Sequence, residues 1–191
     1  MILVQKIKCN LINENCYVVY DNASLDAIII DPGLNYDDIV AFVKNNSLNV
    51  KAILLTHGHF DHTMSCNKLQ KNGYKVYISK DDAYMCDSAE FNFAKDNNID
   101  FPNYTPDYLI NDENELNLGT IHVKILKTPG HSKGGLSYVI GDNLFTGDTL
   151  FEHGYGRTDL NGGNFRDILS SIKKLRTLVK QGYKLYCGHD Y

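Results

Sequence analysis

Short apolar runs recur along the chain, and most of them are bounded by Gly, Pro, Asn or Asp. The runs are rich in β-branched and aromatic residues, a composition that is typical of β-strands. They predict strands at residues 2–8, 16–20, 27–30, 52–55, 75–78, 121–126, 136–140, 143–145 and 184–187. Strands therefore dominate the predicted secondary structure.

Three other segments have the residue spacing of helices. In residues 36–46 and 165–180 the apolar side chains fall on one face, which is the pattern of an amphipathic helix. Residues 63–71, which follow a cluster of His and Asp, predict a third helix, whereas residues 81–107 fit neither pattern. Strands with interspersed helices favour sheet layers that are covered by helices.

Composition and charge narrow the classes of function. The chain has 191 residues and no low-complexity linker, so we expect one domain over residues 1–191. A net charge of −4 argues against a nucleic-acid partner, which normally meets a basic face. No apolar run is long enough to cross a membrane, which argues against a membrane partner. Residues 1–10 alternate apolar and polar positions as a strand does, so we expect no signal peptide and a cytoplasmic location.

Polar side chains follow several of the predicted strands. His57, His131 and His189 each come at or just beyond the end of a strand-like run, and Asp148 does the same. If these strands share a sheet and a direction, their ends bring the four side chains to one edge. Open α/β sheets usually bind ligands at that edge.

Residues 56–62 read Thr-His-Gly-His-Phe-Asp-His and carry the strongest chemical signal. Imidazole and carboxylate groups together suit a borderline metal such as zinc. In an extended loop, His57 and His59 project to the same side and can hold one ion. Asp61 and His62, once the chain has turned into a helix, would face a second ion. This spacing predicts a metal site rather than a chance cluster of polar residues.

The three downstream residues complete this site. His131 and His189 would give each ion a third protein ligand, and Asp148 is placed to bridge the two ions. Three protein ligands leave an open position for water, as catalytic metal sites require. The sequence therefore predicts a pair of open metal sites.

Four other residues with metal-binding side chains are expected to have no role in the site. His122 falls inside a predicted strand, and His153 falls in a loop. Cys66 and Cys187 lie near the ligand segments, but we expect both to be ordinary packing residues. The five cysteines form no CxxC pair, so neither a disulfide framework nor a cysteine-rich zinc site is expected.

The HxHxDH motif of residues 57–62, followed in order by the downstream His, Asp and His, resembles the metallo-β-lactamase superfamily. The resemblance runs from Asn-Cys-Tyr at residues 15–17, through Ile-Asp-Pro-Gly at residues 30–33, to Cys-Gly-His at residues 187–189. It implies an α+β fold of the αββα type, a four-layer sandwich of two mixed sheets flanked by helices. A pair of metal ions lies at one edge of such a sandwich.

The resemblance also implies a role for each ligand. The first metal would be held by His57, His59 and His131, and the second by Asp61, His62 and His189, with Asp148 bridging them. Asp61 is the residue singled out as catalytic. The implied cofactor is a pair of divalent ions, zinc in the first place and iron or manganese as alternatives.

Within the superfamily, residues 128–131, 144–150 and 187–191 are similar to glyoxalase II and its short relatives. This similarity implies a hydrolase in which a metal-bridging hydroxide attacks a small thioester or ester, as a hydroxyacylglutathione hydrolase does. His59 supports the hydrolytic branch, because flavodiiron members carry a carboxylate at that position.

The substrate contacts of glyoxalase II match this chain less well. Its C-terminal helical domain supplies much of the glutathione site, and we expect that domain to be lacking here. Arg157 matches a basic residue that holds glutathione, and Tyr191 matches a tyrosine two positions after the last ligand. Asp159 replaces an aromatic residue and would repel an anionic thiol. An ion pair between Arg157 and Asp159 remains an equal alternative for Arg157.

Other functions remain open. The runner-up is a mononuclear iron persulfide dioxygenase, in which His57 or an equivalent residue, His131 and Asp148 would form a two-His, one-carboxylate iron site. A β-lactamase is disfavoured by the expected lack of a signal peptide, and a nucleic-acid-processing protein by the acidic charge balance. We expect a small-molecule substrate, whose identity the sequence does not indicate.

Overall fold

The computed structural model describes residues 1–9 and 12–190 of the chain, and its strands form two sheets. In the first sheet the strands stand in chain order: β1 (Ile2–Cys9), β2 (Glu14–Asp21), β3 (Asp26–Ile30), β4 (Asn49–Leu54), β5 (Val76–Ser79) and β6 (Tyr108–Ile110). The second sheet has the order β11 (Lys184–Cys187), β10 (Asn143–Gly147), β9 (Leu136–Ile140), β8 (Ile121–Lys127) and β7 (Glu115–Leu118). Each sheet combines parallel and antiparallel pairs, so both are mixed.

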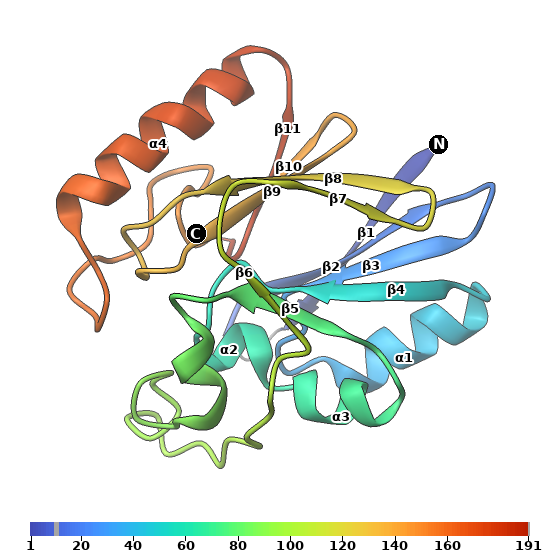
Figure 1. Cartoon of the computed structure of the whole chain (residues 1–191), viewed down its shortest axis with the longest axis horizontal. Coiled ribbons are helices and arrows are strands. Elements are labelled where there is room, and N and C mark those ends of the chain that lie inside the picture. The colour runs from blue at the N-terminus through green and yellow to red at the C-terminus, as the bar shows by residue number, and fades with distance from the viewer. Residues whose placement is uncertain (10–11, 191) are drawn as a thin grey trace.

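Helices cover the outer faces of the two sheets (Figure 1). The first sheet is covered by α1 (Tyr36–Asn45), α2 (Phe60–Thr63), α3 (Cys66–Lys71) and the 3-10 turn η1 (Ala83–Asp87). The second sheet is covered by α4 (Phe165–Lys180), whose Ile168, Ile172 and Leu175 are buried. The four-layer α+β sandwich implied by the resemblance is therefore confirmed. Among the described residues, no helix is long and apolar enough to cross a membrane.

Apolar side chains fill the three spaces between the layers. A central cluster lies between the sheets and includes Ile28, Leu54 and Tyr138, all fully buried. The Tyr138 hydroxyl donates a hydrogen bond of 2.6 Å to the carbonyl of Leu55, so its one polar atom is satisfied in the core. The sheets are thereby fixed face to face at the end where the histidines gather.

The assumption that the ligand-bearing strands share one sheet is wrong. β4, which precedes His57, lies in the first sheet, whereas β8, β10 and β11 lie in the second. β8, β10 and β11 run in the same direction. Their carboxyl ends meet the end of β4 at one edge of the sandwich, so the site lies between two sheets rather than along one.

Two further differences concern elements near the site. The helix predicted over residues 63–71 is shortened to α3, and the separate turn α2 ends at Thr63, because the amide of Ser65 donates to the carbonyl of Pro32 instead of joining the two helices. β6 and β7 were not predicted. β6 has only three residues, and its Tyr108 and Leu109 are exposed at the edge of the sheet, so no buried pattern marks it.

Candidate metal centre

The first group of metal-binding side chains consists of His57, His59 and His131. One ligand atom from each lies within 4.8 Å of the other two, and all three residues are buried. His57 and His59 come from the loop between β4 and α2, and His131 comes from the loop after β8. His59 Nδ1 and His131 Nε2 face each other at 3.0 Å. Residues more than 70 positions apart in sequence are thus brought to one point.

The second group consists of Asp61, His62 and His189, again with ligand atoms within 4.8 Å of one another. Asp61 and His62 lie on the single turn of α2, and His189 follows β11. The two Nε2 atoms of His62 and His189 are 3.2 Å apart, and Asp61 Oδ2 lies 3.4 Å from His189 Nε2. This is the grouping that the resemblance implied for the second metal.

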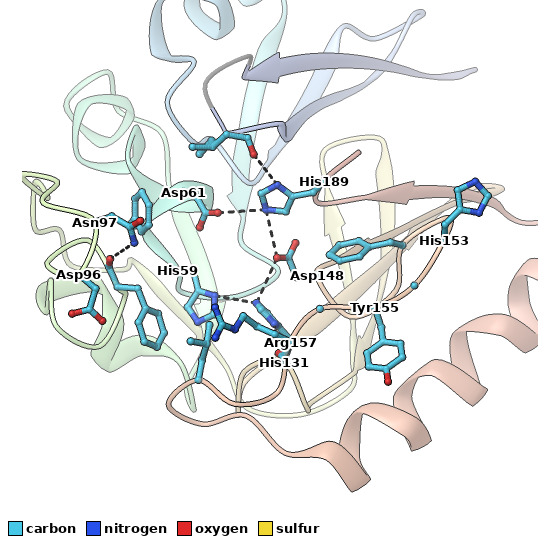
Figure 2. A pocket seen from close by; sticks show the side chains of 17 residues that line it. His59, Asp61, Asp96, Asn97, His131, Asp148, His153, Tyr155, Arg157 and His189 are labelled. Atoms are coloured by element: carbon cyan, nitrogen blue, oxygen red, sulfur yellow. Dashed lines mark hydrogen bonds and ion pairs between the residues drawn. The ribbon is translucent and has the colours of Figure 1, made fainter. Parts of the chain in front are cut away.

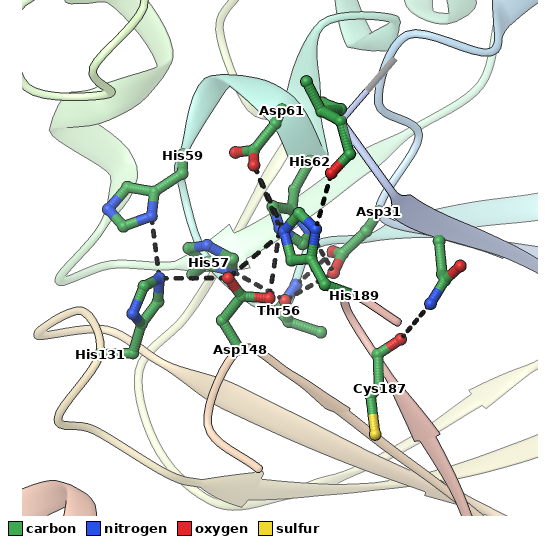
Figure 3. A network of polar contacts seen from close by, with 12 residues as sticks. Asp31, Thr56, His57, His59, Asp61, His62, His131, Asp148, Cys187 and His189 are labelled. Carbon is green, nitrogen blue, oxygen red and sulfur yellow. Dashed lines mark hydrogen bonds and ion pairs between the residues drawn. The ribbon is translucent and has the colours of Figure 1, made fainter. Parts of the chain in front are cut away.

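Asp148 lies between the two groups (Figure 3). Its Oδ2 is 3.5 Å from the Nε2 atoms of both His131 and His189, and its Oδ1 is 3.4 Å from His62 Nε2. Gly147, which precedes it, has a φ of 50°, a left-handed conformation that suits glycine. All seven predicted ligands therefore lie in one cluster, with the Asp148 carboxylate between the two groups.

Hydrogen bonds fix which ring nitrogen faces the cluster in His131, His189 and His62. The Nδ1 atoms of His131 and His189 donate to the backbone carbonyls of Arg157 and Ile12. His62 Nδ1 donates to the Asp31 carboxylate at 3.1 Å. In each case the Nε2 atom is left as the metal-binding nitrogen, an arrangement that is usual around metal-binding histidines.

The donor set fits divalent ions. His57 Nε2 is buried and has no hydrogen-bond partner within the described part of the chain, whereas its Nδ1 contacts the Thr56 hydroxyl at 3.0 Å. Two nitrogens bound at about 2.1 Å to one tetrahedral ion lie about 3.4 Å apart. The 3.0 and 3.2 Å contacts between histidine nitrogens are close to that spacing.

The charge states of the cluster also favour cations. Burial, followed by the neighbouring histidines, lowers the pKa of His57 and of His59, so both are neutral and available as ligands. Although burial alone would raise the pKa of Asp61, His62 and His189 hold it well below its usual range. Burial opposes the charge on His62, but Asp148, Asp61 and Asp31 raise its pKa, so an ion bound there would displace a proton.

Asp31 is a supporting residue that sequence reasoning missed. It is 1% exposed and accepts hydrogen bonds from the Thr56 amide at 2.7 Å and the Thr56 hydroxyl at 2.6 Å, in addition to His62. It therefore positions ligands of both groups. Asp31 lies in the Ile-Asp-Pro-Gly segment that carried the resemblance, but no local pattern indicated its contacts.

A cavity of about 820 Å³ opens onto the cluster (Figure 2). Its walls include Phe93, Phe151 and Tyr155, and the ring of Phe93 meets that of His59 edge-on at 5.0 Å. Asp96 and Arg157 supply charged groups at the walls. The cavity can therefore take a small molecule with apolar parts beside the cluster.

Of the remaining candidate residues, two line the cavity and one lies away from it. Arg157 lines the cavity, and its guanidinium forms two hydrogen bonds of 2.7 and 2.8 Å to Asp159. His153 was expected to have no role, yet it also lines the cavity. His122 is exposed on β8, 3.6 Å from Glu115, away from the site. Tyr191 lies outside the described residues.

The two cysteines near the ligand segments take no part in the cluster. Cys66 is fully buried in the core beneath the first sheet, where burial raises the pKa of its thiol. The Cys187 side chain points away from the histidines (Figure 3), while its backbone carbonyl accepts hydrogen bonds from Tyr17 at 2.6 Å and from Asn15 at 3.1 Å. Neither thiol is placed as a nucleophile.

The fold and the His/Asp cluster together define a metal-binding α/β sandwich, and comparison with known proteins identifies its family. The model of the metallo-β-lactamase superfamily matches residues 10–189. This chain belongs to the metallo-β-lactamase superfamily.

Several relatives are named as hydrolases. The chain is 37% identical to a probable metallo-hydrolase, YqgX, of Bacillus subtilis, covering 93% of this chain and 85% of the relative. It is 33% identical to BaeB of Bacillus velezensis, a probable polyketide biosynthesis zinc-dependent hydrolase, with coverage of 92% and 72%. It is 29% identical to the hydroxyacylglutathione hydrolase GloC of Haemophilus influenzae, with coverage of 97% and 90%.

Solved structures show the same fold. The B3 metallo-β-lactamase BLEG-1 superposes with a TM-score of 0.93 at 30% identity, covering 99% of this chain and 92% of that one. TTHA1623 in a di-iron-bound form gives 0.83 at 27% identity, with coverage of 98% and 93%. ETHE1 from Myxococcus xanthus gives 0.82 at 26% identity, with coverage of 99% and 76%. The relatives and these structures support a divalent-metal protein of the hydrolase type, and they include both a zinc-dependent hydrolase and a di-iron-bound form.

Proposed function

We propose that this chain is a di-metal hydrolase that cleaves a small thioester or ester, with zinc as the first candidate metal. The observation that carries the proposal is the pair of three-residue ligand groups that share Asp148 and face one cavity. The likeness to the hydroxyacylglutathione hydrolase GloC supports the thioester class.

The cavity supports a water-derived nucleophile. Its described lining residues include no Ser, Thr, Cys or Lys, so no covalent nucleophile of these four types faces the cavity. When bound, a pair of divalent ions supplies a hydroxide near neutral pH and stabilises the charge that develops on the carbonyl oxygen. Asp61 stays ionised beside His62 and His189, which suits both a ligand and an acceptor for a proton from that water.

The walls favour a substrate with apolar parts. Phe93, Phe151 and Tyr155 offer aromatic surface, whereas the positive charge of Arg157 is balanced by Asp159. We propose Arg157 as a substrate contact for a carboxylate or carbonyl of the thiol portion. Glutathione is one candidate thiol rather than a requirement.

Thiol release from matched thioesters tests the proposal. The zinc-loaded chain is expected to hydrolyse S-lactoylglutathione or the same acyl group on N-acetylcysteamine, and Asp61→Ala is expected to lose at least about 100-fold in kcat/KM, the scale of losing one ligand and proton acceptor. Asp112→Asn, which disrupts only an exposed ion pair with Lys127, serves as the control. Hydrolysis that is unchanged in Asp61→Ala would overturn the proposal. Hydrolysis of nitrocefin, a β-lactam, is measured alongside the thioesters because of the likeness to the metallo-β-lactamase BLEG-1.

A mononuclear iron persulfide dioxygenase is the second candidate. His131 Nε2 lies 3.5 Å from Asp148, and the ring centroids of His57 and His131 are 4.9 Å apart, so a two-His, one-carboxylate set is assembled here too. The di-iron form of TTHA1623 shows that a similar chain can hold iron. Oxygen consumption with glutathione persulfide by the iron-loaded chain, without thioester hydrolysis, would favour this function over the first.

A further inference from the structure

Asp82 is a buried carboxylate outside the predicted site. It immediately precedes η1 and is 0% exposed. Its Oδ2 accepts a hydrogen bond of 2.6 Å from the Ser132 hydroxyl, and its Oδ1 accepts one of 2.6 Å from the Gly134 amide. The backbone of Gly58 also packs against Asp82, since a Cβ on that glycine would lie 3.1 Å from the Asp82 carbonyl oxygen. No Lys or Arg forms an ion pair with Asp82 within the described part of the chain, so its charge is stabilised mainly by these donors.

Gly58 and the two donors belong to the two loops that form the first ligand group. Gly58 lies between His57 and His59, and Ser132 directly follows His131. The contacts span 50 and 52 residues between Asp82 and the second loop. Asp82 thus contacts both the loop after β4 and the loop after β8, at the point where each carries its ligands.

Glycines allow this close approach. A Cβ on Gly134 would lie 2.7 Å from the Asp82 carboxylate carbon, and one on Gly58 would lie 2.7 Å from Cβ of Met85 in η1. Side chains at either position would push the loops away from η1. Both loops are therefore built to pack against this turn.

We propose that Asp82 is a positioning residue for the first metal group, holding the backbones on either side of His57, His59 and His131 at the separation that lets their ring nitrogens converge. Asp82 itself does not touch the cluster. The second group is held separately, because Asp61 and His62 lie on α2 and His189 follows β11. Loss of Asp82 should therefore weaken the metal affinity of the first group more than that of the second. This effect does not depend on which substrate the protein cleaves.

Zinc titration of the metal-free chain against a chromophoric chelator tests this proposal by yielding one affinity for each group. His59→Ala and Asp61→Ala identify which affinity belongs to the first and second group. Asp82→Ala is expected to weaken the first affinity about 10- to 100-fold, the usual effect of removing a partner that orients ligands, and to leave the second within about threefold. Asp82→Asn, which keeps an acceptor oxygen, is expected to recover most of the loss.

The control is Asp81→Ala, which removes the neighbouring carboxylate and its 3.4 Å contact with Lys133 and should leave both affinities unchanged. If Asp82→Ala does not fold by circular dichroism, Ser132→Ala replaces it, because it removes one donor only and should weaken the first affinity selectively but by less. Equal weakening of both affinities, or no change in a folded variant, would overturn the proposal. Thioester hydrolysis is not part of this measurement, so failure here leaves the proposed function to be judged on its own assay.

Discussion

Replacing Asp31 by Ala should destabilise the metal-free chain strongly. The carboxylate is buried and accepts from the Thr56 amide, the Thr56 hydroxyl and His62 Nδ1. The substitution leaves the Thr56 amide without its acceptor, and Thr56 is only 2% exposed. It also removes one of the three carboxylates that raise the pKa of His62. The variant therefore loses hydrogen bonds and charge compensation together.

The magnitude follows from these contacts. Hydrogen bonds to charged groups are worth about 1.5–3 kcal/mol each, and removing one partner of a buried charged pair costs about 3–5 kcal/mol. We therefore expect Asp31→Ala to lose about 3–5 kcal/mol of unfolding free energy. With a urea slope of about 2 kcal/mol per molar, the unfolding midpoint should fall by about 1.5–2.5 M.

Urea unfolding followed by circular dichroism, at pH 7 and with a chelator present, measures this loss without the contribution of bound metal. Asp112→Ala is the matched control, because its carboxylate is exposed and its contact with Lys127 is 3.4 Å. Exposed substitutions usually change stability by less than about 0.5 kcal/mol. A urea midpoint of Asp31→Ala that lies within about 0.3 M of the wild-type midpoint would refute the argument that Asp31 holds the ligand loops together.

Three further substitutions test other parts of the structure. Gly188→Ala would place a Cβ 2.8 Å from a ring carbon of His62 and against the bridging carboxylate, so metal content by elemental analysis should fall below two ions per chain. Asp159→Asn should free Arg157 and lower KM for S-lactoylglutathione relative to the N-acetylcysteamine thioester by a few-fold. Asp107→Asn should lower the melting temperature at pH 7, because hydrogen bonds from Lys75, Val76 and Gln70 outweigh burial and lower the pKa of Asp107.

The sign of the last effect follows from that lowered pKa. The stability from Asp107 is fully present above the unfolded pKa of about 3.9 and is lost as pH falls through the lowered folded pKa, so the difference in melting temperature between the variant and the unchanged chain should shrink as pH falls below about 3.9. A difference in melting temperature that stays constant as pH falls below about 3.9 would contradict this account. Two ions per chain in Gly188→Ala would contradict the prediction for that variant. In Asp159→Asn, an unchanged ratio of the KM values for S-lactoylglutathione and the N-acetylcysteamine thioester would contradict the prediction for Arg157.

The clustering of the seven candidate ligands was predictable because its signals are local. Residues 57–62 place three histidines and one carboxylate in a single loop and turn, and the chemistry of those side chains is specific even before the fold is known. His131, Asp148 and His189 each follow a strand-like run, with a glycine directly before them. The structure brings these seven residues together as the family resemblance implied.

The supporting residues were not predictable, because their contacts join distant parts of the chain. Asp31 meets Thr56 across 25 residues, and Asp82 meets Ser132 across 50. Residues 81–107 gave no clear pattern because turns organise much of this segment. Asn92, for example, is fully buried and hydrogen bonds to Met85 and Ala94. Phe93, which follows it with a φ of 67°, reaches the cavity from a conformation that no apolar periodicity indicates.

Metal content per chain tests the central claim most directly. Protein purified without chelators or metal-binding tags is analysed for zinc, iron and manganese, together with His59→Ala and Asp61→Ala as variants that each remove a ligand of one group. The proposed function predicts two divalent ions per wild-type chain and fewer metal ions per chain in each variant. One iron per chain, unaffected by Asp61→Ala and with no second ion after reconstitution with zinc, would contradict the two-metal account.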